Sequence, residues 1–159
     1  MVPNPLPQTS ELYEAARLRQ ANLQDAPSLT TLYNRARDTQ AETVQSMLSW
    51  LEHGGALLLE TDQKEILCAL RWQEEGPGWR VDRVATLPAS RGQSYGRWLM
   101  TKVEALAIRT NISTLTLTLD EVRDDLLTYY QRMGYQITEQ GKESVTLEKR
   151  VGGVWQYKQ

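Results

Sequence analysis

The sequence has very few of the residues from which disulfides and zinc sites are built. Cys68 is the only cysteine and His53 the only histidine among 159 residues. A single cysteine cannot form an internal disulfide, and one cysteine with one histidine cannot supply a Cys/His zinc site. The composition therefore favours a reducing, cytoplasmic setting, and we expect no metal to take part in the function.

Long apolar runs and an excess of positive charge are also missing. The longest apolar runs, such as 56–59, are far shorter than the roughly 18 residues that span a bilayer. Residues 1–8 hold three prolines and no basic residue, unlike a secretory signal, and 1–16 are expected to form a tail. The net charge is -2, whereas nucleic-acid-binding proteins usually carry a strongly basic face. We therefore expect neither a membrane nor a nucleic acid as partner.

What the chain does contain is enough apolar material for one core. Hydrophobic residues make up 40% and charged residues 24%, a mixture typical of a globular protein. The length suits one domain with a proper core and is too short for two comfortable ones. We therefore expect a single domain over 17–159.

Periodicity and turn residues predict eleven elements along this domain. In chain order they are a strand at 17–21, helices from 25 and at 42–51, strands at 56–60, 65–72 and 79–87, a helix at 95–109, a strand at 114–119, a helix at 124–133, and strands at 135–138 and 144–149. The order β-α-α-β-β-β-α-β-α-β-β predicts an α+β fold. Its mixed, mostly antiparallel sheet is flanked by helices on both faces, unlike a doubly wound parallel fold.

Several local signals accompany these elements. Asp25 is expected to cap the first helix, and Gly54 with Gly55 to end the second. His53, beside these glycines, is interpreted as a capping residue, with a catalytic base as the alternative. Cys68 lies in an apolar strand and is interpreted as a buried thiol.

The most informative segment is the turn between the strand at 79–87 and the helix at 95–109. It reads Pro88-Ala89-Ser90-Arg91-Gly92-Gln93-Ser94-Tyr95-Gly96-Arg97. A strand, a glycine-containing turn and a helix together direct free N–H groups and the positive end of a helix dipole at one point. Two arginines add charge, so we expect a phosphate there. Ser94 fits this turn if its φ stays negative, and its hydroxyl could then donate to phosphate or cap the helix.

A second motif lies downstream at Tyr129-Tyr130-Gln131-Arg132-Met133-Gly134-Tyr135. The turn Pro-x-x-Arg-Gly-x-Ser-x-Gly, the ending Tyr-x-x-x-Gly-aromatic and the element order together resemble the GNAT superfamily of acetyl-CoA-dependent N-acyltransferases. The likeness covers roughly 17–149. The family's turn reads Arg/Gln-x-x-Gly-x-Gly/Ala, and Ser94 replaces one of its glycines.

The resemblance implies how coenzyme A is bound. The N–H groups of 92–97 would hold its pyrophosphate, and the strand residues 84–86 would pair with its pantetheine arm. Arg123 stands where the family often has an asparagine that contacts the cofactor. The implied cofactor-binding residues are Val84, Ala85, Thr86, Arg91, Gly92, Gln93, Ser94, Tyr95, Gly96, Arg97 and Arg123.

The resemblance also implies catalytic roles for residues of this chain. Tyr130 falls on the family's general-acid tyrosine, although taken alone it reads as a core aromatic beside Gly134. Some members carry a glutamate base where this chain has Thr118. Asp82 shares a strand face with Val84 and is a candidate general base, directly or through a water, with an ion pair to Arg80 or Arg83 as the alternative.

The predicted function is transfer of an acetyl group from acetyl-CoA to a primary amine of a small molecule or peptide, in a ternary complex. A non-catalytic coenzyme A sensor or regulatory module with the same fold is the alternative. The acceptor would be shaped by 33–42 and by residues near 135–142. A homodimer is compatible with a sheet edge expected at 144–149 and with Trp155 and Tyr157 in the C-terminal tail.

Overall fold

The computed structural model describes residues 16–152, so the predicted tail lies outside the described residues except for its last residue. The described residues fall into two compact units, 16–73 with 84–103 and 74–83 with 104–152. Two elements continue from one unit into the other, β3 and α4. Each unit is described by itself.

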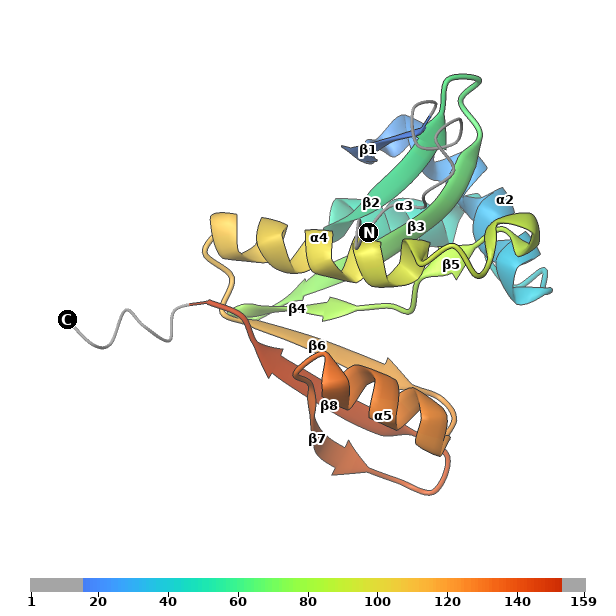
Figure 1. The fold of residues 1–159 in the computed structure, drawn as a ribbon. Coiled ribbons are helices and arrows are strands. Elements are labelled where there is room, and N and C mark those ends of the chain that lie inside the picture. Colours follow the sequence, from blue (N-terminus) through green and yellow to red (C-terminus); the bar gives the residue numbers. More distant parts are fainter. Residues whose placement is uncertain (1–15, 153–159) are drawn as a thin grey trace, which may run out of the picture. The chain divides into compact units, whose positions relative to one another are not determined.

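The first unit contains most of the N-terminal half of the chain (Figure 1). Its elements are β1 (Ala16–Gln20), η1 (Leu23–Asp25), α2 (Ala26–Arg37), α3 (Val44–Glu52), β2 (Gly54–Thr61), β3 (Ile66–Glu75), β5 (Ala85–Thr86), η2 (Pro88–Ser90) and the start of α4 (Tyr95–Arg109). The second unit holds β4 (Gly78–Val81), the end of α4, β6 (Thr114–Leu119), α5 (Asp124–Arg132), β7 (Gln136–Gln140) and β8 (Val145–Arg150).

In the first unit the strands are antiparallel, and helices cover two faces. β2 pairs with β1 and β3, and β5 pairs with β3 with Cys68 opposite Thr86. The central residues of β2 and β3 are buried on both faces, as expected for strands between two helical layers. Figure 1 shows α2 and α3 on one side of these strands and α4 on the other. Cys68 is fully buried, as predicted.

The buried Arg71 of β3 links this sheet to both N-terminal helices. Its guanidinium donates to the two carboxylate oxygens of Glu42 at 2.9 and 2.8 Å. Its Cζ lies 4.2 Å from the centroid of the Tyr33 ring in α2 and 4.3 Å from that of Trp50 in α3. This charge is therefore desolvated but fully engaged, by a bidentate ion pair and two aromatic faces.

Asp25 occupies the N-cap position of α2, as predicted, but its side chain forms no cap hydrogen bond there. Instead its carboxylate accepts from the Arg19 guanidinium at 2.9 and 2.7 Å and from the N–H of Asn22 at 2.8 Å. Arg19 also binds the buried Glu60. The Arg19 hydrogen bonds hold the pKa values of both carboxyl groups below their ordinary range. The Asp25 carboxylate, which the local sequence assigned to the cap of α2, therefore accepts hydrogen bonds from Arg19 of β1 instead.

The second unit contains mixed strands with α5 over one face (Figure 1). β6 lies between β4, which is parallel to it, and β8, which is antiparallel, and β7 pairs with the other side of β8. The leucines of β6 are buried, as its strict alternation predicted. The prediction of a sheet edge at 144–149 is wrong, because β8 pairs with β6 on one side and with β7 on the other. Trp155 and Tyr157 lie outside the described residues.

Two further boundaries differ from prediction. The strand expected at 79–87 is interrupted, since residues 82–84 separate β4 from β5. The side chain of Asp82 accepts the N–H of Arg83 at 2.9 Å, a local bond that competes with a strand ladder. Gly54 and Gly55 begin β2 rather than end α3, and a Cβ on Gly54 would overlap the carbonyl oxygen of Trp72. The cap of α3 is His53, as predicted.

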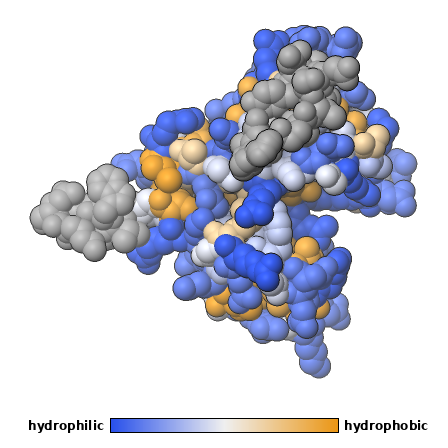
Figure 2. All heavy atoms as spheres, in the orientation of Figure 1, coloured by the Kyte–Doolittle hydropathy of each residue, from blue (hydrophilic) through white to orange (hydrophobic). Residues whose placement is uncertain are grey.

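The mixed, mostly antiparallel α+β fold is thus confirmed, with the predicted long strand divided into β4 and β5. Hydrophilic residues cover most of the face seen in Figure 2. Within residues 16–152, no helix is long and apolar enough to span a membrane.

Candidate active site

In the first unit, the turn before α4 contains two residues with positive φ and leads into the N-terminus of the helix. After η2, Gly92 has φ +80° and Ser94 has φ +65°. The N–H of Trp98 donates to the Ser94 carbonyl at 3.1 Å, which is the first hydrogen bond of the α-helical type in α4. The amides of Tyr95, Gly96 and Arg97 precede this bond. Such amides have no partner inside a helix and carry the positive end of its dipole. The arrangement can bind a phosphate group.

The condition under which Ser94 was expected to fit the turn is not met. Its φ is positive, in the left-handed region. An L-residue with a Cβ pays about 1–2 kcal/mol in this conformation, whereas glycine does not. Ser94 therefore has a backbone conformation that glycine would adopt without this strain.

Ser94→Gly is expected to raise the free energy of unfolding by about 0.5–1 kcal/mol, since relief of left-handed strain exceeds glycine's extra unfolded-state entropy. Urea denaturation measures the change. Gly92→Ala is the matched control. It should lose about 1 kcal/mol, because a Cβ there meets no atom within 4 Å and only the backbone conformation is tested. A Ser94→Gly variant that is less stable than wild type would contradict the strain argument.

The segment predicted to pair with pantetheine lies against this turn. A Cβ added to Gly96 would lie 3.8 Å from the side chain of Val84, so α4 begins beside residues 84–86. The Leu87 N–H donates to the Leu67 carbonyl of β3 at 2.9 Å. Because strand residues alternate, the backbone groups of Ala85 also point to β3, and those of Val84 and Thr86 point away from it. An extended ligand can therefore pair with Val84 and Thr86.

Of the side chains of the turn, that of Arg91 is hydrogen-bonded and that of Tyr95 is buried. Arg91 donates to the carbonyl of Ala36 in the last turn of α2. The ring of Tyr95 is buried, and its hydroxyl has no hydrogen-bond partner among the described residues. Burial raises the pKa of Tyr95. Tyr95 can therefore bind an anion only through its backbone N–H. The side chain of Arg97, by contrast, is exposed and can contact an anion directly.

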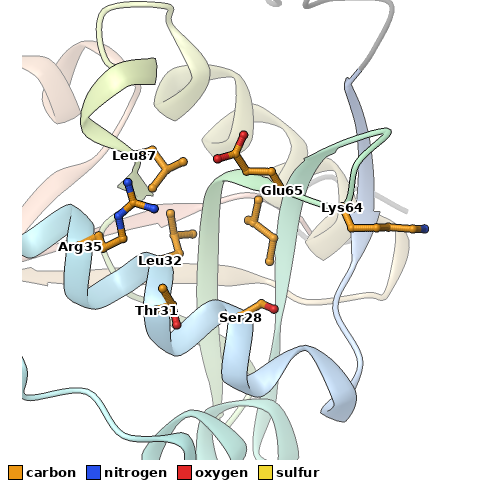
Figure 3. Close-up of a pocket in the computed structure, with 8 residues that line it drawn as sticks. Ser28, Thr31, Leu32, Arg35, Lys64, Glu65 and Leu87 are labelled. Carbon is orange, nitrogen blue, oxygen red and sulfur yellow. The ribbon is translucent and has the colours of Figure 1, made fainter.

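Two cavities border the first unit's α2. One, of about 200 Å³, has an apolar lining of Leu32, Ile66 and Leu87 and a polar lining that includes Arg35 and Glu65 (Figure 3). No predicted site residue lines it, but Leu87 directly precedes η2. The other, of about 250 Å³, is lined by residues 34, 35 and 38–40. It lies within the stretch 33–42 that the resemblance assigns to the acceptor.

The second unit contains the predicted catalytic residues. Tyr130 is buried in the last turn of α5, and its ring packs edge-on against Tyr129 and Tyr135 at 5.0 and 6.0 Å between centroids. Burial raises the pKa of Tyr130 to about 12, the Tyr129 and Asp82 charges add to the rise, and Arg83 opposes it. Asp82 therefore lies within electrostatic range of the Tyr130 hydroxyl, which is protonated at neutral pH.

The other charged candidates of this unit are held in ion pairs. Arg80 binds Glu75 at 2.9 Å, and the Arg83 guanidinium lies 3.9 Å from Asp120. Arg123 is exposed at the N-cap position of α5 and binds Asp125 at 2.7 Å and Glu121 at 3.2 Å. Among residues 16–152 no group of three His, Cys, Asp or Glu side chains could hold a metal ion.

Residues 52–137 match the family described as the acetyltransferase (GNAT) domain. The chain therefore belongs to the GNAT acetyltransferase family, as its motifs and fold indicated. It is 32% identical over 139 residues to the S-alkylcysteine N-acetyltransferase of Bacillus subtilis (strain 168), covering 75% of this chain and 78% of that protein.

Solved structures show the same fold at low identity. The ribosomal-protein-S18-alanine N-acetyltransferase from Escherichia coli superposes with a TM-score of 0.75 at 15% identity, over 87% of this chain and 96% of that chain. The PaiA N-acetyltransferase from Thermoplasma acidophilum, solved in complex with coenzyme A, superposes with a TM-score of 0.67 at 11% identity, over 86% and 99%. At these identities the likeness bears on the fold alone.

Proposed function

We propose that the protein is an N-acetyltransferase that transfers the acetyl group of acetyl-CoA to a primary amine. The observation that carries the proposal is the start of α4, where a left-handed turn directs helix amides beside the outward backbone groups of Val84 and Thr86. A diphosphate followed by an extended amide-containing arm is the ligand that suits this surface. Coenzyme A has both parts.

The cofactor-binding residues would hold coenzyme A through backbone N–H groups and through the charges of two arginines. The amides of 92–97 would donate to the diphosphate, with charge from Arg91 and Arg97. A helix N-terminus contributes up to about 2 kcal/mol, whereas micromolar binding needs about 8 kcal/mol. The remainder must come from the other amides, the two arginines and the pairing at Val84 and Thr86. Arg91 would have to exchange its bond to Ala36 for phosphate, or contribute through its charge where it stands.

The transfer needs no covalent enzyme intermediate. The neutral amine would attack the thioester carbonyl, the C–S bond would break, and the acceptor's proton would end on the departing thiolate. Tyr130 would donate a hydrogen bond to that sulfur. Before the attack, Asp82, directly or through a water, would take one proton from the acceptor's ammonium to give the neutral amine. Since the Tyr130 pKa is about 12 and a thiol's about 8.5, complete proton transfer from Tyr130 would be uphill by about 5 kcal/mol. Tyr130 would therefore act as a donor, not as a proton source.

The acceptor class draws on the relative from Bacillus subtilis, whose name specifies S-alkylcysteine. An S-alkylcysteine is a small amino acid that carries an α-amine. The polar cavity at 34–40 has room for a group of this size. S-alkylcysteines are therefore the first acceptors to test, followed by other amino acids, peptide N-termini and polyamines.

Titration calorimetry with acetyl-CoA and coenzyme A tests the proposal first, and release of free thiol with the amine panel tests it second. Acetyl-CoA should bind with micromolar Kd. S-acetylpantetheine, which lacks the diphosphate, should bind about 100-fold more weakly, or about 3 kcal/mol. Binding without transfer to any amine would favour a coenzyme A sensor, and absence of binding would overturn both functions.

A further inference from the structure

The turn that ends α5 is closed by the carbonyl of Tyr130 itself. That oxygen accepts the N–H of Met133 at 3.0 Å and the N–H of Tyr135 at 3.1 Å. Between them Gly134 has φ +101° and donates to the Gln131 carbonyl at 3.0 Å. The position of the Tyr130 backbone is therefore coupled to the conformation of the next five residues.

Lys149 of β8 reaches this turn from another part of the second unit. Its ammonium donates to the Met133 carbonyl at 2.7 Å and to Glu104 Oε1 of α4 at 3.0 Å. It also lies 5.8 Å from the centroid of the Tyr135 ring, and the Tyr135 hydroxyl donates to Glu104 Oε2 at 3.4 Å. One cation thus joins the end of α5, the aromatic ring that packs on Tyr130, and the carboxylate that holds this ring.

We propose that Lys149 is a positioning residue for Tyr130, an inference that rests on the catalytic role given to Tyr130 above. Met133 carries one of the last carbonyls of α5, where a helix presents partial negative charge. A partly buried ammonium at that carbonyl stabilises the turn in which Tyr130 and Tyr135 meet. The stem of Lys149 also packs on the turn, since a Cβ on Gly134 would lie 3.1 Å from its Cε.

The ammonium can be removed while the stem is kept. Lys149→Met is expected to lower kcat about tenfold with the KM for acetyl-CoA unchanged, because misplacement of a reacting group affects the chemical step. Lys149→Arg, which keeps a donor cation, should recover part of the loss. Arg150→Met, at the exposed cation next to Lys149 on β8, is the matched control and should leave kcat unchanged. Wild-type kcat in Lys149→Met would overturn the inference.

Two further measurements separate this inference from the proposed function. In Lys149→Met, amide hydrogen exchange should rise about tenfold at Met133, Gly134 and Tyr135, whatever the acceptor is. In a Tyr130→Phe background, Lys149→Met should lower kcat no further, and additive losses would overturn the inference. Unchanged kcat in Tyr130→Phe alone would instead overturn the catalytic role of Tyr130, while the exchange rates would still report whether Lys149 holds the turn.

Removal of Lys149 leaves Glu104 partly buried without this partner, which itself could unfold the protein. The double variant Lys149→Met with Glu104→Gln removes both charges and keeps an oxygen acceptor for Tyr135. It should fold and should show the same faster exchange and lower kcat. Wild-type exchange and kcat in this double variant would also overturn the inference.

Discussion

Tyr130→Phe is expected to lower kcat about 100-fold, which is the size of loss caused by removing one well-placed hydrogen-bond donor. Acetyl-CoA affinity should be unchanged. The phenylalanine ring keeps the edge-on packing against Tyr129 and Tyr135, so the loss would come from the hydroxyl alone. Steady-state kinetics with the best acceptor, together with calorimetry, gives both quantities.

The pH profile distinguishes a donor from a proton source. With a pKa near 12, the Tyr130 hydroxyl is protonated at every pH at which the protein would be assayed. No limb of the kcat profile between about pH 6 and 10 should therefore belong to it. A basic limb that is present in wild type and absent in Tyr130→Phe would show that Tyr130 titrates in this range. It would also contradict the role proposed here.

Tyr129→Phe is the matched control for this prediction. Tyr129 is the neighbouring residue of α5 and is only half-buried, whereas Tyr130 is buried. The change again removes one hydroxyl and leaves the aromatic pair in place. Its kcat should stay close to that of wild type. An equal loss in both variants would indicate a general perturbation of α5.

The sequence predicted those parts of the fold that depend on neighbouring residues. The strand at 114–119 alternates strictly, and its leucines are buried as expected. The helix at 95–109 has the predicted bounds, and Gly134 takes the left-handed conformation that ends α5. In each case the pattern and the structure share one physical cause within a few residues.

The failures arose where a distant or side-chain partner decided the outcome. Asp25 was assigned to a helix cap, but Arg19 took its carboxylate. The strand 79–87 was predicted unbroken, but Asp82 bonded the next backbone amide. Ser94 was expected to fit the turn if its φ stayed negative, yet its φ is +65°. Local preference cannot predict these partners.

The candidate site was predicted unevenly for the same reason. The turn before α4 is a local motif, and the resemblance assigned its roles. Arg71 and Lys149 were not predicted, because their carboxylate partners lie 29 and 45 residues away. A signal was present for Arg71, since a charge within the apolar run 66–72 must find a partner when the strand is buried. The partner itself cannot be read from the sequence.

Arg71→Met is expected to lower the free energy of unfolding by about 3 kcal/mol, because it leaves the Glu42 carboxylate without its bidentate partner in a site with little water. Arg37, 3.8 Å from Glu42, compensates in part. Arg71→Lys should lie in between, since an ammonium cannot pair with both oxygens of one carboxylate and stack between two rings. Urea denaturation measures the series.

Two comparisons test whether the loss in Arg71→Met comes from the unpaired Glu42 carboxylate. Arg80→Met breaks the ion pair with Glu75, whose side chain is 58% exposed, and should cost less than about 1 kcal/mol. Arg71→Met with Glu42→Gln removes both charges of the buried pair and should recover much of the loss, because the penalty comes from the unpaired carboxylate. Additive losses in this double variant would mean that Arg71 stabilises the protein through Tyr33 and Trp50 instead. In that case the segment between α2 and α3, which the resemblance assigns to the acceptor, would not be anchored by the Arg71–Glu42 ion pair.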